Sequence, residues 1–384
     1  MPHDTNPDLL FENIALVHSG EDYFSRLENI IHNSLFEIHI QTYLFENDTT
    51  GNRILTALKE AASRQVKIYL LLDGLGSLHF PSQLRNELKK SGINIRFFAP
   101  LFSTYTFYIG RRLHQKIVVS DGKVALLGGI NIADKYHGTA TEAPWLDYAV
   151  QLNGEIAKPI QEICNAIYFK KSHPSNQKLK TAFQLHKDTL VRILQNDWLK
   201  RKNEISNAYK SSIGNAKKEI IIVGSYFLPG RQIIHALKKA AKNKVEIKLI
   251  LSGKSDLPMT RRATCYLYSK LLSYNIELYE WNESVLHGKA AVIDEYWTTI
   301  GSFNLNNLSS YGSLEMNVEI KSTEFSKMYR EQLNQIIAKC QRITPEDLEI
   351  KNNLFLKLGN WFSYYSTRLI ELLVIYTPYN RFHN

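Results

Sequence analysis

Two segments of the chain, residues 114–131 and 287–304, carry the same pattern of chemically active residues. The first reads HQKIVVSDGKVALLGGIN and the second reads HGKAAVIDEYWTTIGSFN. Counted from the histidine, both place a lysine at +2, an aspartate at +7, a glycine at +14 and an asparagine at +17. A single His-x-Lys triplet would be weak evidence, but two copies with five matching positions indicate a duplicated unit of structure.

The residues before each motif repeat as well. An apolar, strand-like run is followed by a helical run with apolar residues at three- and four-residue spacing, and a second strand-like run follows the helix. The sequence therefore predicts an α/β fold with two pseudo-symmetric α/β/α lobes and mixed, largely parallel sheets. The repeated runs lie at 37–45, 53–65 and 66–73 in the first half, and at 219–228, 231–244 and 245–253 in the second half.

The repeat also divides the chain into expected domains. We expect the first lobe over residues 1–172 and the second over 190–350, with a polar, proline-containing linker at 173–189. The opening of the second lobe, residues 190–216, is predicted to be helical, and residues 351–384 are predicted to form a separate amphipathic segment. The alternative is that the polar stretch is a loop on one continuous domain.

The charge balance favours an anionic partner. Lys and Arg number 47 against 37 Asp and Glu, which gives a net charge of +10 with neutral histidines. Such an excess suits nucleic acid or an anionic membrane surface and does not choose between them.

The three cysteines show no metal-ligand or disulfide spacing, and the first residues lack the pattern of a signal peptide. This use of cysteine fits a reducing cytoplasm best. No apolar run reaches the ~18 residues of a membrane-spanning helix.

Each motif is predicted to be a β-hairpin with chemistry on one side. A histidine and a lysine two positions apart on a strand point to the same side of the sheet. Turn signals at Asp121 and Asp294 reverse the chain, and the returning strand brings Asn131 or Asn304 back beside the His and Lys. We interpret both aspartates as structural supports. The alternative, hairpin residues without chemistry, fits one isolated motif better than it fits two matching ones.

The duplicated pattern H-x-K-x4-D-x6-G-[GS]-x-N resembles that of the phospholipase D superfamily, and the resemblance runs from about residue 15 to about residue 340. Further segments are similar to bacterial cardiolipin synthases of the type without N-terminal membrane helices. These segments are GGINIADKY, PWLDYAVQLNG, SYFLPG, GSFNLNN and LEMNVEI.

The resemblance implies one active site at the interface between the lobes, with no metal and no cofactor. One histidine of such a site attacks phosphorus to give a phosphohistidine, and the other protonates the leaving oxygen. Glu315 matches the family's glutamate, whereas Asp147 on the corresponding first-half strand departs from that pattern and offers a shorter carboxylate. The implied site residues are His114, Lys116, Asp147, His287, Lys289 and Glu315 for catalysis, and Gly129, Asn131, Ser302 and Asn304 for phosphate binding.

The implied function is a phosphatidyltransferase that moves a phosphatidyl group from phosphatidylglycerol to a hydroxyl acceptor. The alternatives are a phospholipase D or nuclease-type phosphodiesterase with water as acceptor, and a binding module without activity, against which the intact motifs argue. We expect anionic phospholipid and the membrane surface as partners, with nucleic acid less favoured. The expected location is peripheral, on the cytoplasmic face of the cell membrane.

Two aromatic-rich segments bear on membrane binding. Residues 97–112 precede the first motif and end in two arginines, and residues 353–382 place apolar side chains on one helical stripe. The first is predicted to insert into lipid or to stack on nucleic-acid bases, and the second to form an interfacial helix at a membrane. The alternatives are a loop that covers the core, and a helix that packs on a lobe or on a second copy of the chain.

Overall fold

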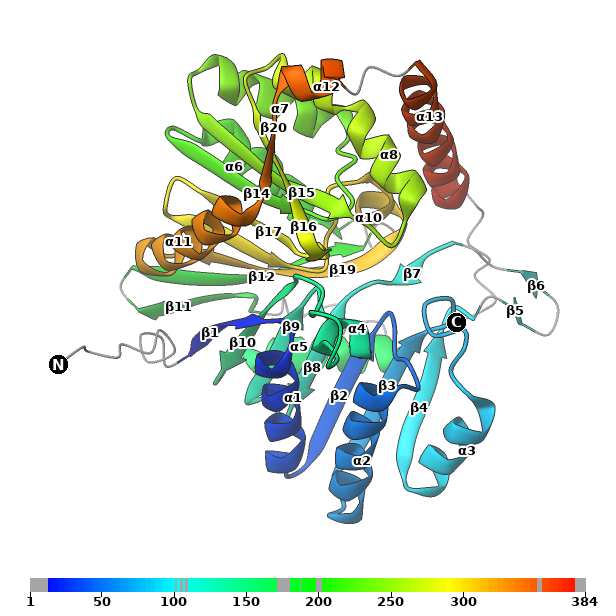
Figure 1. The fold of residues 1–384 in the computed structure, drawn as a ribbon. Coiled ribbons are helices and arrows are strands. Elements are labelled where there is room, and N and C mark those ends of the chain that lie inside the picture. The colour runs from blue at the N-terminus through cyan, green and yellow to red at the C-terminus, as the bar shows by residue number, and fades with distance from the viewer. Residues whose placement is uncertain are drawn as a thin grey trace.

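The structure is a computed structural model that describes residues 13–376 apart from 101, 104–105, 108–109, 171–179, 187, 198–201 and 351–353. Within these residues the chain forms two lobes, each built on one large β-sheet (Figure 1). Much of the expected linker and parts of the segments 97–112 and 353–382 lie outside the described residues.

The first lobe runs from β1 to α5. Its strands are β1 (Ile14–His18), β2 (Glu37–Thr42), β3 (Lys67–Asp73), β4 (Ile93–Phe98), β8 (Lys116–Ser120), β9 (Val124–Gly128) and β10 (Tyr148–Asn153). Its helices are α1 (Glu21–Asn33), α2 (Thr49–Ser63), α3 (Ser82–Lys90), α4 (Asp134–His137) and α5 (Ala157–Tyr168). Short strands precede the first motif: β5 (Phe102–Ser103), β6 (Thr106–Phe107) and β7 (Arg112–Leu113).

The second lobe repeats this plan and adds strands and helices at both ends. Its strands are β11 (Ala182–His186), β12 (Thr189–Asp197), β13 (Lys202–Asn203), β14 (Glu219–Gly224), β15 (Glu246–Lys254), β16 (Glu277–Val285), β17 (Lys289–Ile293), β18 (Trp297–Gly301), β19 (Ser313–Lys321) and β20 (Gln341–Ile343). Its helices are α6 (Glu204–Asn215), α7 (Arg231–Lys242), α8 (Pro258–Tyr266), α9 (Tyr268–Leu272), α10 (Asn307–Tyr311), α11 (Thr323–Lys339), α12 (Pro345–Ile350) and α13 (Leu354–Tyr376).

The strand orders confirm the predicted duplication. The first sheet has the order β1-β10-β9-β8-β2-β3-β4, and the main path of the second is β11-β12-β19-β18-β17-β14-β15-β16-β20. The run β9-β8-β2-β3-β4 thus corresponds to β18-β17-β14-β15-β16. Both motifs occupy the same place in their sheets, at the hairpins β8–β9 and β17–β18.

The sheets are mixed, as expected, but the sequence analysis overstated their parallel share. Within the two large described sheets, parallel pairing joins β2, β3 and β4, then β14, β15 and β16, and also β7 with β19. The other ladders of these sheets are antiparallel, including those of both motif hairpins. A tight turn can join only antiparallel strands, whereas a parallel pair needs a crossover such as a helix.

Two expectations about the middle of the chain were wrong. Residues 190–197 are not helical but belong to β12, which pairs with β11 and β19, and helix α6 begins only at Glu204. Strand β11 lies at 182–186, inside the expected linker, and belongs to the second sheet. The Leu, Arg and Gln residues of β12 favour helices on their own, and pairing with β19 overrides this weak preference.

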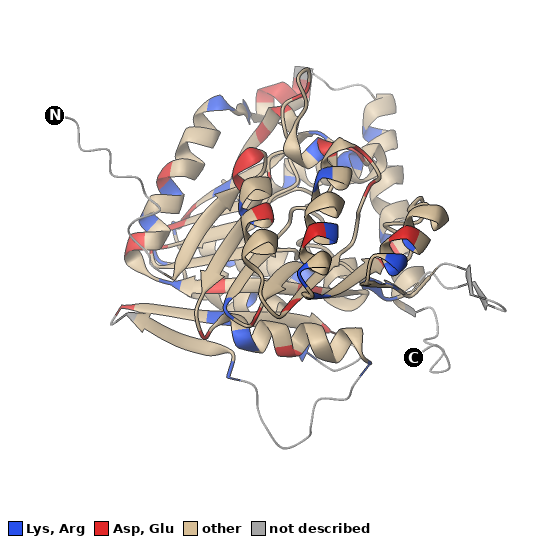
Figure 2. Cartoon of the chain, turned by 90° about the horizontal axis from the view of Figure 1, so that it is seen from below, with Lys and Arg blue, Asp and Glu red and all other residues tan. Residues whose placement is uncertain are grey.

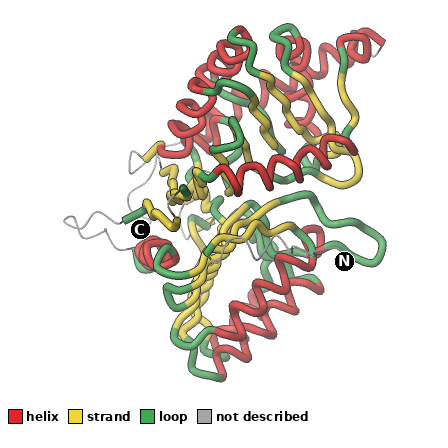
Figure 3. The backbone as a smooth tube through the Cα atoms, turned by 90° about the vertical axis from the view of Figure 1, so that its left-hand side faces the viewer, coloured by secondary structure: helices red, strands yellow, loops and turns green. Residues whose placement is uncertain are grey.

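Each lobe is an α/β/α sandwich, and the two lobes share a core. Helices α1, α2 and α3 cover the outer face of the first sheet, and α6 to α9 cover that of the second. The inner faces of both sheets, with α5 and α11, contribute to one continuous apolar cluster. Figure 3 shows the two lobes stacked one on the other. Tyr148 of β10 packs against Tyr329 of α11 with ring centroids 5.2 Å apart. The lobes are therefore joined by burial as well as by the chain.

The last helix, α13, lies against the second lobe (Figure 1). The ring of Tyr266 in α8 lies 4.7 Å from that of Tyr364 and 6.0 Å from that of Tyr365. Across the described residues, no helix combines the length and the apolar character needed to cross a membrane.

The aspartate of each motif ties its hairpin to the start of a neighbouring strand. Asp121 and Asp294 both have φ of 53°, and each carboxylate accepts hydrogen bonds from three consecutive backbone N–H groups. Those of residues 35–37 lie 2.8–2.9 Å from Asp121, and those of residues 217–219 lie 2.6–3.0 Å from Asp294. These contacts are those of structural supports.

We predict that Asp294→Ala lowers the free energy of unfolding by about 2 kcal/mol, because three backbone donors lose a charged acceptor. Urea denaturation measures this change. The control Glu155→Ala, at an exposed turn position, should change the free energy of unfolding by less than about 0.5 kcal/mol. Equal stability of the two variants would contradict the supporting role of Asp294.

Candidate active site

A short parallel contact between the lobes positions the first motif. Strand β7 pairs with the start of β19, with Leu113 opposite Leu314, and the backbone N–H of His114 donates to the Leu314 carbonyl at 3.0 Å. His114 and Glu315 follow this pair directly, so they emerge side by side. Nδ1 of His114 lies 3.0 Å from the carboxylate of Glu315, to which the Ser302 hydroxyl also donates at 2.5 Å.

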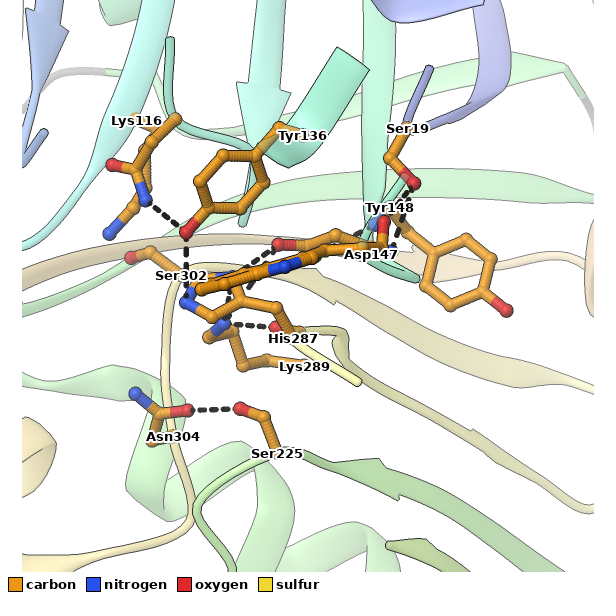
Figure 4. A network of polar contacts seen from close by, with 12 residues as sticks. Ser19, Lys116, Tyr136, Asp147, Tyr148, Ser225, His287, Lys289, Ser302 and Asn304 are labelled. Atoms are coloured by element: carbon orange, nitrogen blue, oxygen red, sulfur yellow. Dashed lines mark hydrogen bonds and ion pairs between the residues drawn. The ribbon is translucent and has the colours of Figure 1, made fainter. Parts of the chain in front are cut away.

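A matching contact positions the second motif. Leu146 forms a parallel bridge with Leu286, and the backbone N–H of His287 donates to the Leu146 carbonyl at 2.8 Å. Nδ1 of His287 lies 2.6 Å from Oδ2 of Asp147 (Figure 4). Each histidine is therefore paired with the carboxylate of the opposite lobe, an exchange that the sequence analysis did not anticipate.

These pairs are largely withdrawn from water. The side chain of His114 is 16% exposed and that of His287 is 5% exposed, and both carboxylate side chains are fully buried. Hydrogen bonds to charged groups are stronger in such surroundings, because little water competes for them. Both imidazole rings are consequently held in fixed orientations.

The two motif lysines are buried beside their histidines. Nζ of Lys116 donates to the backbone carbonyl of His114 at 2.5 Å. Nζ of Lys289 donates to the carbonyl of His287 and lies 3.9 Å from the carboxylate of Asp147 (Figure 4). Two ammonium groups thus lie next to the two imidazoles, as the shared side of the strand predicted.

The two motif asparagines are oriented by their side-chain oxygens. Oδ1 of Asn131 accepts hydrogen bonds from the Thr42 hydroxyl at 3.2 Å and from the Leu44 backbone N–H at 3.1 Å. Oδ1 of Asn304 accepts a hydrogen bond from the Ser225 hydroxyl at 3.0 Å (Figure 4). Because the oxygens are engaged in this way, the NH2 groups are the parts that can donate to an anion.

The small residues that precede the motif asparagines, Gly129 and Ser302, contact the two buried carboxylates. A Cβ at Gly129 would lie 2.3 Å from Oδ1 of Asp147, so any side chain there would displace that carboxylate. At the corresponding position Ser302 is tolerated, and its hydroxyl donates to Glu315. The sequence analysis expected Gly129 and Ser302 to bind phosphate, whereas the contacts present here are with the carboxylates.

Burial shifts the proton affinity of the site. It lowers the pKa of Lys116 to about 7 and that of Lys289 to about 8, because an ammonium ion loses its hydration. It also lowers the pKa of His114 below its usual value, and that of His287 much further, so both rings are neutral near pH 7. For Asp147, burial raises the pKa to about 6.

Sequence reasoning missed the aromatic residues around the histidines. The ring of Tyr43 lies 5.4 Å from that of His114, and the ring of Tyr226 lies 5.9 Å from that of His287. Both tyrosines follow equivalent strands, β2 and β14, in the segments TYLF and SYFL. Alignment of these two segments of the repeat would have found them.

Two further aromatic residues surround only the second histidine. The rings of Tyr136 and Trp145 lie 5.2 Å and 5.8 Å from that of His287. The repeat of the sequence gives no signal for them, because the second half has Ser309 five residues after its motif asparagine and Ser313 two residues before Glu315.

The sequence matches the family described as "Cardiolipin synthase, PLD-like domain" over residues 27–164 and 209–337. It is 33% identical over 343 residues to cardiolipin synthase B of Escherichia coli strain K12, covering 86% of this chain and 82% of that protein. It is 29% identical over 343 residues to a minor cardiolipin synthase of Bacillus subtilis strain 168, covering 87% of this chain and 84% of that protein.

A solved structure shares the fold. The crystal structure of phosphatidylserine synthase from Haemophilus influenzae Rd KW20 superposes with a TM-score of 0.73 at 14% identity, and the match covers 95% of both chains. This likeness extends to the two-lobed arrangement, while the sequence matches define the relationship. The chain belongs to the cardiolipin synthase family of proteins with phospholipase D-like domains.

Proposed function

We propose that the chain is a phosphatidyltransferase of the cardiolipin synthase type, which moves a phosphatidyl group from phosphatidylglycerol to the hydroxyl of a second lipid. The observation that carries the proposal is the meeting of two histidine–carboxylate pairs, His114–Glu315 and Asp147–His287, with two buried lysines at the lobe interface. The relatives that this chain matches over most of their length are named as cardiolipin synthases.

The reaction needs one histidine as nucleophile and one as proton carrier. The Nε2 lone pair of the first forms a bond to phosphorus, and the bond from phosphorus to the donor's glycerol oxygen breaks. The second histidine gives that oxygen a proton, so glycerol leaves as a neutral molecule. It then takes the proton from the acceptor hydroxyl, whose oxygen bonds to phosphorus as the nitrogen–phosphorus bond breaks.

The remaining site residues suit the charge that this transfer develops. A carboxylate on each Nδ1 fixes the tautomer, presents Nε2 to the substrate and stabilises the imidazolium. Lys116 and Lys289 would neutralise the phosphate oxygens, and the amide groups of Asn131 and Asn304 would donate to them. The same site would carry out hydrolysis if water replaced the acceptor hydroxyl. An assay of the products distinguishes a lipid acceptor from water.

The exposed face of α13 supports a membrane partner. Its buried side chains include the polar Ser363 and Glu371, at 4% and 5% exposure, whereas Phe355 is 82% exposed. A helix on the surface of a protein in water shows the opposite arrangement, with the apolar stripe inside. The exposed apolar side chains also include Leu354, Leu356, Leu358, Trp361, Phe362, Tyr365, Leu369, Ile370, Leu372 and Leu373. Such a face suits the interface of a bilayer.

Polar contacts hold α13 in this orientation beside the second motif. Arg368 donates to the carbonyl of Pro229 at 2.7 Å and to Glu371 at 3.1 Å. Asn307 of α10, three residues after Asn304, donates to Glu371 at 3.2 Å. The apolar face is therefore directed outward by a helix anchored close to the site, which suits a lipid substrate.

The distribution of charge favours a lipid surface over nucleic acid. In the view of Figure 2, Lys and Arg positions are interspersed with Asp and Glu positions along helices and strands. Strands of nucleic acid are usually bound along a continuous basic groove. We therefore propose a peripheral protein on the cytoplasmic face of the membrane, where its three free cysteines would stay reduced.

We predict that purified protein forms cardiolipin from phosphatidylglycerol vesicles with chelator present, and that His114→Ala and His287→Ala each lower the rate by at least about 10²-fold. Lipid extraction and mass spectrometry measure the product. His235→Ala, which removes an exposed histidine of α7, should leave the rate unchanged. Release of phosphatidic acid without cardiolipin would favour water as acceptor, and cleavage of single-stranded DNA without lipid turnover would reject the proposal.

The dependence of kcat/KM on pH should be bell-shaped. Below about 6, the pKa to which burial raises Asp147, this carboxyl becomes protonated and no longer stabilises an imidazolium at His287. Above about 7 to 8, the pKa values to which burial lowers Lys116 and Lys289, the lysines lose the charge that binds phosphate. Initial rates on monomeric short-chain phosphatidylglycerol give the profile. Asp147→Asn should remove the acidic limb, and a profile flat from about pH 5 to about pH 9 would contradict these roles.

The face of α13 can be tested without shortening the chain. Phe362→Glu combined with Leu369→Glu should weaken binding to phosphatidylglycerol vesicles by at least about tenfold, because two large apolar side chains lose their burial in lipid. Co-sedimentation measures binding. Leu35→Glu with Phe36→Glu, which alters two residues of similar exposure on the first lobe, is the matched control. Equal binding by both double variants would contradict a membrane role for α13.

A further inference from the structure

The two histidines differ at Nε2, the nitrogen that faces the substrate. The hydroxyl of Tyr136 accepts a hydrogen bond from Nδ2 of Asn131 at 2.8 Å and lies 3.4 Å from Nε2 of His287 (Figure 4). Within the described residues, no side chain makes the corresponding contact with Nε2 of His114. Tyr136 therefore links a motif asparagine of the first lobe to the histidine of the second.

The duplication does not generate this contact. Tyr136 lies five residues after Asn131, and the position five residues after Asn304 is Ser309. The hydroxyl of Ser309 accepts a hydrogen bond from the backbone N–H of Asn304 at 3.2 Å. This hydroxyl therefore holds the backbone of Asn304 in place, and it contacts neither histidine. The link is a property of one half of the site only.

Tyr136 is held firmly in place. Its side chain is buried at 2% exposure, and its ring meets the ring of His287 edge-on with centroids 5.2 Å apart. Trp145 packs against both rings, at 5.1 Å from Tyr136 and 5.8 Å from His287. The Trp145 carbonyl in turn accepts a hydrogen bond from the Ser19 hydroxyl at 2.5 Å. The phenol thus has little freedom to leave Nε2 by a change of rotamer.

The direction of the hydrogen bonds follows from the partners. Nδ1 of His287 lies 2.6 Å from the carboxylate of Asp147 and 2.8 Å from Nζ of Lys289, which also donates to the His287 carbonyl. Because the carboxylate can only accept, we assign the ring proton to Nδ1, and Nε2 of the neutral ring is then an acceptor. Burial raises the pKa of Tyr136 well above 10, so the phenol keeps its proton. The Tyr136 hydroxyl therefore donates to Nε2 and accepts from Asn131, and the lone pair of His287 is occupied in the resting enzyme.

We infer that Tyr136 is a positioning residue that commits His287 to proton exchange and leaves His114 as the nucleophile. The inference rests on the proposed function. A lone pair that already accepts a hydrogen bond is a poorer nucleophile, but its nitrogen is well placed to pass a proton. The long 3.4 Å contact can be replaced by a nearer substrate oxygen.

With the anionic phosphodiester bound, His287 takes a proton from solvent and becomes an imidazolium. The Nε2 lone pair of His114 forms the bond to phosphorus, the bond to the leaving oxygen breaks, and Nε2–H of His287 transfers its proton to that oxygen. His287 returns to the neutral form, in which Nε2 accepts the proton of the acceptor hydroxyl in the second step. Tyr136 aligns Nε2 in both steps and is not itself consumed.

A leaving group that needs no proton separates positioning from folding. Phosphatidylglycerol releases a basic alkoxide, whereas phosphatidyl-p-nitrophenol releases a stable phenolate. Tyr136→Phe should lower kcat on phosphatidylglycerol by about tenfold or more and change the burst of p-nitrophenol release by less than about twofold. Equal losses on both substrates, or no loss on either, would overturn the inference.

The matched control is Tyr168→Phe. This variant also removes a buried tyrosine hydroxyl, which donates to the Asn94 carbonyl at 3.0 Å on the first sheet and contacts neither histidine. Its kcat should be unchanged on both substrates. If Tyr168→Phe reproduced the selective loss on phosphatidylglycerol, the effect would not belong to Tyr136 and the inference would fail.

The covalent intermediate gives an independent measurement. In His287→Ala, the p-nitrophenyl substrate should still form a phosphatidyl-enzyme that accumulates on the peptide containing His114, because no base activates the acceptor. His114→Ala should form none. An adduct on His287 in the wild-type protein would overturn the inference. If the adduct forms on His114 but no lipid acceptor is used, the proposed transferase function fails while the inference stands.

Discussion

The active site depends on two backbone contacts between the lobes. At each contact a leucine of one lobe pairs in parallel with a leucine of the other, Leu113 with Leu314 and Leu146 with Leu286. The residues that follow are a histidine on one chain segment and a carboxylate on the other. Neither lobe alone contains both partners of His114–Glu315 or of His287–Asp147, so this arrangement exists only in the packed protein. The shared apolar core between the sheets is what holds those contacts in register.

The packed site also concentrates charge in a way that an anion can relieve. Two carboxylates, Asp147 and Glu315, lie buried with two ammonium groups, Lys116 and Lys289. Burial of an isolated charge is unfavourable by several kcal/mol, and partners of opposite sign offset this only in part. Burial lowers the pKa of both lysines, which indicates that their positive charge lacks sufficient counter-charge. A bound phosphodiester would supply it, so the site is complementary to an anion.

The sequence predicted the repeat and the hairpins because identical spacing of the motif residues survives in both halves. For Asp147 and Glu315, which stand 16 and 11 residues after the motif asparagines, the sequence offered only the resemblance to the family. It did not predict that the carboxylates exchange lobes, since local spacing carries no information about contacts some 140 to 200 residues apart. The strand β12 was mistaken for a helix because its pairing with β19 is equally remote in sequence. Tyr136 was missed because its partner, His287, lies 151 positions away and the repeat provides no counterpart.

The departures from symmetry are coupled to one another. Asp147 is one methylene shorter than Glu315, so its carboxylate lies closer to the backbone and occupies the space where a Cβ of residue 129 would lie. Glycine at 129 is therefore required by aspartate at 147, while the longer Glu315 leaves room for Ser302 and gains a hydrogen bond from its hydroxyl. The histidine paired with Asp147, His287, is also the more deeply buried of the two. The rings of Tyr136, Trp145 and Tyr226 surround it. In the proposed transfer the two histidines take different roles, and these paired substitutions are where the two halves of the duplicated fold differ around them.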